Sequence, residues 1–378
     1  MSQGPTGTVG RRRLAASLPD FPWDSLDAAK TAAGAHPDGI VDLSVGTPVD
    51  PTPEIGRRAL ADAADSPGYP LTSGTPALLR AIADYLDSRW GAVGIAPEAT
   101  LPVIGTKELV AWIPTLLGLG PDDLVVFPAM AYPTYEVGAR IAGCRFLAAE
   151  DPTTLDETPA LVWLNSPSNP TGEILSGPEL RRRVDWARQR GAIVASDECY
   201  GEFGWDAEPV SVLHPDVSGG DHTDLLALFS LSKRSNLAGY RAGFVAGDGQ
   251  LVAELLAVRK HAGMIPPRPV QEAMRVLLGD QTHVNEQYER YRRRRALLRP
   301  ALEAAGFTIE HSEGSLYLWA TRGEDGRDSV AWLAERGILV APGDFYGAAA
   351  AQFVRVGLTA SDERIAAAAE RLSGSSAG

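Results

Sequence analysis

Residues 230–243 of the chain read SLSKRSNLAGYRAG, and the lysine in this run is Lys233. The chain has only four lysines among its 35 basic residues, so the remaining 31 are arginines. Lysine differs from arginine because its amine can lose a proton and attack a carbonyl carbon. The apolar stretch 225–229 precedes the run and predicts a buried strand. The run therefore predicts a reactive lysine at the end of a buried strand.

Two serines and an arginine accompany this lysine. Hydroxyl and guanidinium groups bind phosphate dianions well. The run resembles the cofactor-lysine signature of the pyridoxal-phosphate (PLP) aminotransferases of fold type I, in which S-x-S-K is followed eight residues later by an arginine. The resemblance implies that Lys233 bonds covalently to the cofactor aldehyde, while Ser230, Ser232 and Arg241 hold the cofactor phosphate. Taken alone, the run leaves an ordinary exposed loop lysine as the alternative.

Length, charge and cysteine content restrict the class of protein. A chain of 378 residues exceeds the usual size of a single core and predicts two lobes. The net charge of −13 argues against a nucleic-acid partner. Two cysteines, Cys144 and Cys199, cannot build a disulfide framework and indicate a reducing cytoplasm. The arginine run 11–13 precedes too short an apolar stretch for a signal peptide or membrane helix, and the histidines show no metal-ligand spacing.

The middle of the chain alternates apolar runs with helical patterns. The expected strands are 101–104, 124–127, 160–164, 192–196, 225–229 and 243–246. Continuous apolar strands are buried on both faces, which predicts an α/β fold with a mostly parallel sheet between helices. Beyond residue 265 the expected elements are helices at 270–278 and 283–305 and strands at 315–320 and 352–358. We predict an N-terminal segment at 1–45, a large cofactor-binding domain at 46–265 and a smaller α+β domain at 266–378.

Polar residues follow the predicted strands, at the sheet edge where ligands bind in such folds. Gly105, Thr106 and Lys107 open a helix after the first strand, and free N–H groups at a helix start favour phosphate. Tyr132 follows the second strand. The family stacks an aromatic ring on the cofactor at this point, and a turn tyrosine on the surface is the alternative.

The next two strand ends carry an amide and a carboxylate. Residues 165–172 read NSPSNPTG, which resembles the family loop N-P-x-N-P-T-G and implies that Asn169 donates to the cofactor phenolate oxygen. Asp197 ends a buried strand, where an unpaired carboxylate is costly. The resemblance assigns Asp197 to the protonated pyridine nitrogen and Tyr200 to the phenolate. The spacing of 28 residues from Asn169 to Asp197, and of 36 to Lys233, fits one βα unit per interval.

Further matches concern the reaction and the assembly. Arg355 in the run FVRVGL and Gly46 in the run LSVGTP match the groups that bind the substrate α-carboxylate in the family. Lys233 would then also transfer the proton at the substrate Cα, in a ping-pong reaction through the pyridoxamine form of the cofactor. Tyr69 matches a residue that reaches the phosphate of a partner subunit, which implies a homodimer with a composite site.

The resemblance is closest to the N-succinyldiaminopimelate aminotransferases of lysine biosynthesis. The stretches that carry it are 18–24, 41–50, 101–108 and 341–347. It implies transfer of an amino group from N-succinyl-LL-2,6-diaminopimelate to 2-oxoglutarate. This substrate has three carboxylates, and Lys107, Arg234 and Arg268 are the further candidate cations, with solvated surface charge as the alternative for the two arginines.

Other functions remain open at this point. A general alanine-, aspartate- or glutamate-type aminotransferase is the nearest alternative, and a C–S lyase or a cyclising synthase would share the cofactor site. A transcription regulator built on this fold needs an N-terminal DNA-binding domain. About forty residues precede Gly46, and the chain is acidic, so the sequence argues against a regulator.

Overall fold

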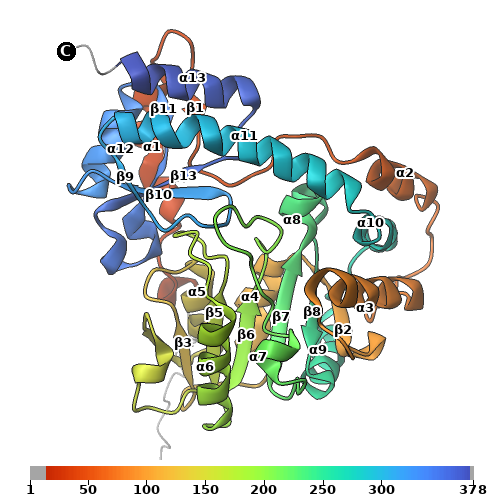
Figure 1. Ribbon diagram of the computed structural model, residues 1–378. Helices are drawn as coiled ribbons and strands as arrows, with labels where there is room; N and C mark the ends of the chain where they lie inside the picture. The colour runs from red at the N-terminus through yellow and green to blue at the C-terminus, as the bar shows by residue number, and fades with distance from the viewer. Residues whose placement is uncertain (1–13, 375–378) are drawn as a thin grey trace, which may run out of the picture.

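The computed structural model describes residues 14–374 of the chain, so the arginine run 11–13 lies outside the described residues. The described part contains a seven-stranded, a four-stranded and a two-stranded sheet. Figure 1 shows the large sheet in the lower part of the molecule and the smaller sheets above it. The long helix α11 (Thr282–Ala304) runs across the top, from the smaller sheets to the short helix α8 (Leu231–Arg234).

The seven-stranded sheet has the order β2-β8-β7-β6-β5-β3-β4. Its strands are β2 (Thr100–Ile104), β3 (Leu124–Phe127), β4 (Arg145–Ala148), β5 (Leu161–Asn165), β6 (Ile193–Asp197), β7 (Leu225–Ser230) and β8 (Ala242–Gly247). Strands β4, β3, β5, β6 and β7 are parallel, whereas β8 is antiparallel to both of its neighbours. The predicted α/β fold with a mostly parallel sheet is therefore confirmed.

Helices cover both faces of this sheet. Strand β7 is apolar from Leu225 to Phe229 because each of its faces is packed against helices. Leu225, Ala227 and Phe229 belong to the core on one face. Leu226 and Leu228 belong to the core on the other. The helices on the first face are α3 (Pro76–Trp90), α6 (Gly177–Arg188), α7 (Pro215–Ser218) and α10 (Arg268–Leu278), with α2 (Glu54–Asp62) packed on α10. Those on the second face are α4 (Thr106–Leu116), α5 (Thr134–Ala142) and α9 (Gly249–Ala262).

Strand β4 was not predicted from the sequence. It lies at the edge of the sheet, next to β3 alone, and most of its residues are exposed. An exposed edge strand needs no continuous apolar run, so its sequence carries no signal of the kind that marked the buried strands.

The smaller unit is built on the C-terminal part of the chain. Its elements are α11, β9 (Thr308–Glu310), β10 (Tyr317–Thr321), α12 (Gly326–Ala334), β11 (Ile338–Leu339), β12 (Ala341–Pro342), β13 (Phe353–Gly357) and α13 (Asp362–Ser373). The N-terminal α1 (Asp27–Gly34) packs on α12, and β1 (Val41–Asp42) pairs with β11. The sequence placed 270–278 in this smaller unit, but the apolar residues of α10 belong to the core that covers the large sheet.

Among the helices of residues 14–374, none combines the length and the apolar character that a membrane crossing requires. The same residues contain no group of three or more acidic, histidine or cysteine side chains arranged to hold a metal ion.

Candidate active site

A cavity of about 510 Å³ opens at the ends of β5, β6 and β7, below the smaller unit. It brings together almost all of the predicted site residues. Those that line it are Gly46, Thr106, Lys107, Tyr132, Asn169, Asp197, Tyr200, Ser230, Ser232, Lys233, Arg241 and Arg355. They come from segments more than three hundred residues apart in the chain, and the parallel sheet gathers them at one edge.

Lys233 reaches the cavity from α8, which begins directly after β7 ends at Ser230. The Ser230 hydroxyl caps this helix by accepting a hydrogen bond from the Ser232 backbone N–H at 3.1 Å. The ammonium nitrogen of Lys233 donates to the carbonyl oxygen of Gly46. Burial lowers the pKa of Lys233, and the positive charges of Arg355 and Arg241 act in the same direction, while Tyr317 partly opposes the shift. A lysine with a lowered pKa supplies a larger fraction of neutral, nucleophilic amine.

Asp197 presents a buried carboxylate at the end of β6. The Tyr135 hydroxyl donates to Oδ2 at 3.0 Å, and the Cys199 backbone N–H donates to Oδ1 at 3.2 Å. Burial raises the pKa of Asp197, although these hydrogen bonds partly oppose the shift. No lysine or arginine of residues 14–374 forms an ion pair with it. A buried carboxylate without a cation is costly, so this side chain favours a positively charged ligand in the cavity.

The loop after β5 is held against Asp197 and Arg355. Asn165 Nδ2 donates to the backbone oxygen of Asp197 at 2.9 Å, and its Oδ1 accepts from the Asn169 N–H at 2.8 Å. The peptide bonds before Pro167 and Pro170 are cis. These contacts place the Asn169 side chain at the cavity, where its Oδ1 accepts from Arg355 Nη1 at 2.8 Å.

Arg355 enters the cavity from β13 of the smaller unit and is 3% exposed. Nη2 donates to the carbonyl oxygen of Ser44 at 2.8 Å. The guanidinium lies 3.9 Å from the ring centre of Tyr317 and 5.0 Å from that of Tyr346. Nε has no partner within the described protein. The guanidinium is thus fixed in orientation and keeps donors for an anionic ligand.

A pair of tyrosine hydroxyls lies between Lys233 and Arg355. The hydroxyl oxygens of Tyr200 and Tyr317 are 2.9 Å apart. Burial would raise the pKa of Tyr317, but the positive charges of Arg355 and Lys233 outweigh burial and lower it. The pKa of Tyr200 is raised, first by burial and then by Tyr317. The sequence predicted Tyr200 but not Tyr317, because Tyr317 lies in an ordinary buried strand without a motif.

The other end of the cavity is lined by hydroxyls and Arg241. Helix α4 begins at Thr106, directed at this end, and its start offers free N–H groups. Gly105, which precedes the helix, has a φ of +75°, and a Cβ at this position would collide with the Arg241 guanidinium. The positive φ favours glycine at this position, since other residues rarely adopt it. Burial lowers the pKa of Lys107, and the charge of Arg241 lowers it further.

Three sequence candidates lie away from the cavity. Tyr69 is fully exposed on this chain. Arg268 is 42% exposed and lies 3.9 Å from Glu272. Arg234 was expected either in the substrate pocket or on the surface, but it is buried and forms an ion pair with Glu202 at 3.2 Å. The direction of the Arg234 side chain, away from the cavity, follows from the helical turn of α8 and cannot be read from its position next to Lys233.

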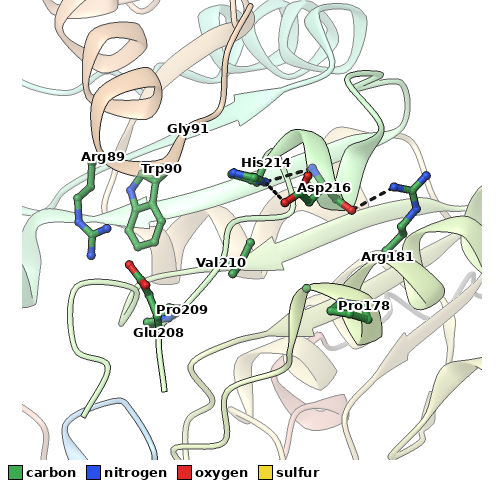
Figure 2. Close-up of a pocket in the computed structure, with 11 residues that line it drawn as sticks. Arg89, Trp90, Gly91, Pro178, Arg181, Glu208, Pro209, Val210, His214 and Asp216 are labelled. Atoms are coloured by element: carbon green, nitrogen blue, oxygen red, sulfur yellow. Dashed lines mark hydrogen bonds and ion pairs between the residues drawn. The ribbon is translucent and has the colours of Figure 1, made fainter. Parts of the chain in front are cut away.

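A second cavity, of about 610 Å³, lies on the face covered by α3, α6 and α7. Figure 2 shows Arg89 and Trp90 along one side of it and Arg181 on the other, with His214 and Asp216 between them. It shares no lining residue with the first cavity in the described part of the chain. None of the site residues predicted from the sequence lines this second cavity.

Comparisons with known proteins agree with this geometry. A probable aminotransferase of Mycobacterium tuberculosis is 63% identical over 363 residues, which cover 96% of this chain and 87% of that protein. The 4-dedimethylamino-4-oxo-anhydrotetracycline transaminase OxyQ of Streptomyces rimosus is 58% identical over 94% of this chain and 99% of its own length.

A solved structure from Thermus thermophilus, a probable N-succinyldiaminopimelate aminotransferase, superposes with a TM-score of 0.84 at 30% identity, over 94% of this chain and 100% of that one. The model of the family "Aminotransferase class I and II" matches residues 38–372. The chain therefore belongs to the class I and II aminotransferases, a family whose members depend on PLP.

Proposed function

We propose that this aminotransferase transfers the amino group of N-succinyl-LL-2,6-diaminopimelate to 2-oxoglutarate, in the biosynthesis of lysine and diaminopimelate. The observation that carries the reaction class is a single cavity that holds a buried lysine, a buried carboxylate without a cation, and a buried arginine with free donors. The substrate is supported by the likeness to the Thermus thermophilus structure of that name.

The residues of the cavity fit PLP. The carboxylate of Asp197 lacks a cation, and the ring nitrogen of PLP is one when protonated. Arg241, Thr106 and two serines match a phosphate dianion. Tyr132 lines the same cavity with an aromatic face, so all parts of the cofactor have a partner of suitable chemistry. When bound, the cofactor supplies an aldehyde and a ring that accepts electrons from the substrate Cα.

Lys233 has two tasks in this proposal. It would first hold the cofactor by a covalent bond. Once the substrate amine has replaced it, its free Nζ would take the proton from the substrate Cα and deliver it to the C4′ carbon of the cofactor. The lowered pKa of Lys233, caused first by burial, suits both tasks because each requires the neutral amine. The nearby hydroxyls of Tyr200 and Tyr317 offer hydrogen bonds to the cofactor phenolate and to the substrate.

Arg355 binds the α-carboxylate of the substrate in this proposal. Its guanidinium keeps three of five donors free after its bonds to Asn169 and Ser44. A planar guanidinium with adjacent free donors binds a carboxylate through two parallel hydrogen bonds. The backbone N–H of Gly46, which lines the same cavity, is the second group that we assign to this carboxylate.

The remaining cation at the cavity is Lys107, which we assign to a distal carboxylate of the substrate. Its Nζ lies 5.7 Å from the ring centre of Phe21, at a wall that also includes Trp23 and Val45. This apolar wall favours a second candidate substrate, a large oxo compound of the kind named for OxyQ, which is 58% identical to this chain.

We also propose a homodimer. The Tyr69 side chain is fully exposed on the single chain, as expected for a residue that completes the site of a second copy. Full activity of a monomer would contradict this assembly.

The test of the function is a half-reaction assay on the purified protein. Glutamate is added first, and candidate oxo compounds, N-succinyl-2-amino-6-oxopimelate and a 4-oxo-anhydrotetracycline, are then compared by the absorbance of the bound cofactor. We expect the succinylated compound to restore the original spectrum fastest. Faster recovery with the tetracycline compound would favour the second candidate, and recovery with neither would refute both.

The covalent role of Lys233 has its own test. Lys233→Ala should abolish the adduct that borohydride traps between protein and cofactor, whereas Lys260→Ala, at an exposed lysine, should retain it. An undiminished adduct in Lys233→Ala would refute the assignment.

A further inference from the structure

Glu202 and Arg234 form a buried ion pair beneath the cavity. Arg234 Nε lies 3.2 Å from Glu202 Oε1, and the two side chains are 4% and 6% exposed. Neither residue lines the cavity, but each is close in sequence to one that does. Arg234 follows Lys233 directly, and Glu202 stands two residues after Tyr200. The pair therefore joins the segment that carries the lysine to the segment that carries the tyrosine.

Helix α3 fixes the carboxylate of this pair from a third side. The Tyr85 hydroxyl donates to Glu202 Oε1 at 2.8 Å, and Arg89 Nε donates to Oε2 at 2.9 Å. The guanidinium of Arg234 also lies 4.8 Å from the ring centre of Tyr85. Burial would raise the pKa of Glu202, but the charges of Arg234 and Arg89 outweigh burial and lower it, so the carboxylate is ionised.

The two segments have little room to shift on their own. Arg234 Nη1 donates to the carbonyl oxygen of Leu277, at the end of α10, at 3.1 Å. A Cβ at Gly201 would lie 2.6 Å from a ring atom of Trp90, so the loop between Tyr200 and Glu202 is pressed against α3. Helix α8 has only four residues and cannot be stable by itself. Its position must come from side chains that anchor it.

We propose that Glu202 and Arg234 are positioning residues that set the placement of Lys233 Nζ relative to the Tyr200 hydroxyl. This inference rests on the proposed function, in which both groups act on one bound cofactor. Groups that act together must be held to fractions of an ångström, and a small displacement costs rate without removing any reacting atom. One buried ion pair provides this constraint for two segments of the chain at once, because the Tyr85 hydroxyl anchors it to α3 and the bond of Arg234 to Leu277 anchors it to α10.

The test compares three variants of the PLP-loaded enzyme. Arg234→Met removes the cation of the pair, and Glu202→Gln removes its charge while retaining the shape. In Arg234→Met/Glu202→Gln neither buried charge is left alone, so this variant decides the question if the single variants fail to fold. The matched control is Arg89→Met, which removes the other cation of Glu202, at the edge of the second cavity (Figure 2), without touching α8.

We expect kcat to fall roughly 10- to 100-fold in Arg234→Met. KM for glutamate should change by less than about threefold, because the carboxylate seat at Arg355 is intact. The pH midpoint of the cofactor absorbance change should move by more than about 0.5 unit, since it reports the surroundings of the cofactor. The double variant should show the same changes, and Arg89→Met should show neither.

Two results would overturn the inference. The first is a kcat and a pH midpoint of the double variant that equal those of the unmodified enzyme. The second is an equal loss in Arg89→Met, which would mean that the cluster supports stability alone. Failure of the cofactor assignment, on which the inference rests, is a separate outcome, since the unmodified enzyme would then yield no borohydride-trapped adduct at Lys233.

Discussion

Replacing Arg355 by lysine tests the proposed carboxylate seat most directly. Arg355→Lys retains the positive charge but removes the planar fork of donors that lies between Tyr317 and Tyr346. The ammonium of lysine can still make one charge-assisted hydrogen bond to a carboxylate, so the substrate loses the second. Such a bond contributes about 1.5–3 kcal/mol. At 1.36 kcal/mol for each factor of ten, kcat/KM for glutamate should fall by about 10- to 150-fold.

The assay needs a substrate that does not use the seat. Glutamate and 1-phenylethylamine, an amine without a carboxylate, are compared in the first half-reaction by the change in cofactor absorbance. Any general disturbance of the cavity, including the lost contacts with the two tyrosines, affects both donors alike. The ratio of the two rates therefore isolates the carboxylate contact. An equal fall for both donors, or an unchanged rate for glutamate, would refute the assignment of Arg355.

Two further predictions concern side chains to which the sequence assigned no role. Tyr135→Phe removes the hydroxyl that donates to Asp197, so the carboxylate is less stable in its charged form. The dissociation constant of PLP, measured by titration of the apoenzyme, should therefore rise by about tenfold. An unchanged dissociation constant would contradict the role of this hydrogen bond. Asp50→Asn breaks a half-buried pair with Arg294, which keeps Asp362 as a partner, and should lower the free energy of unfolding by about 1–2 kcal/mol, measured with urea. Hydrogen bonds and the charge of Arg294 outweigh burial and lower the pKa of Asp50, so its contribution is present above the unfolded pKa and is lost as the pH falls through the folded one; equal pH dependence in the variant would contradict it.

The sequence predicted those parts of the fold in which a single physical cause, such as burial on both faces of a strand, produces a recognisable local pattern. Strand β7 is apolar from Leu225 to Phe229 because both of its faces are covered, and the predicted strand and the observed one agree within a residue. Strand β4 shows the limit, because an exposed edge strand is held by its neighbour β3 rather than by its own composition. Helix α10 shows a second limit of sequence-based prediction, because the sequence indicates the helix but not which of the two hydrophobic cores it packs against.

The site residues also fall into those that the sequence predicted and those that it did not. Lys233, Asp197 and Asn169 lie in short contiguous motifs at strand ends, so their chemistry and spacing are visible in the sequence. The groups that hold them come from elsewhere: Tyr135 points back from α5 to Asp197, and Tyr317 reaches the cavity from a strand of the smaller unit. Such contacts depend on how elements pack in three dimensions, and no spacing along the chain records them.

The cations of the cavity bear on the proposed substrate and the proposed dimer together. Apart from Lys233, the described chain presents Lys107, Arg241 and Arg355 at the cavity. In the proposed site, Arg241 is assigned to the cofactor phosphate and Arg355 to the α-carboxylate, which leaves Lys107 for the two further carboxylates of N-succinyl-diaminopimelate. Arg234 cannot bind a distal carboxylate, because it is buried in an ion pair with Glu202. One distal carboxylate must therefore remain in solvent or meet a cation of a second copy, and the fully exposed Tyr69 independently favours the second copy.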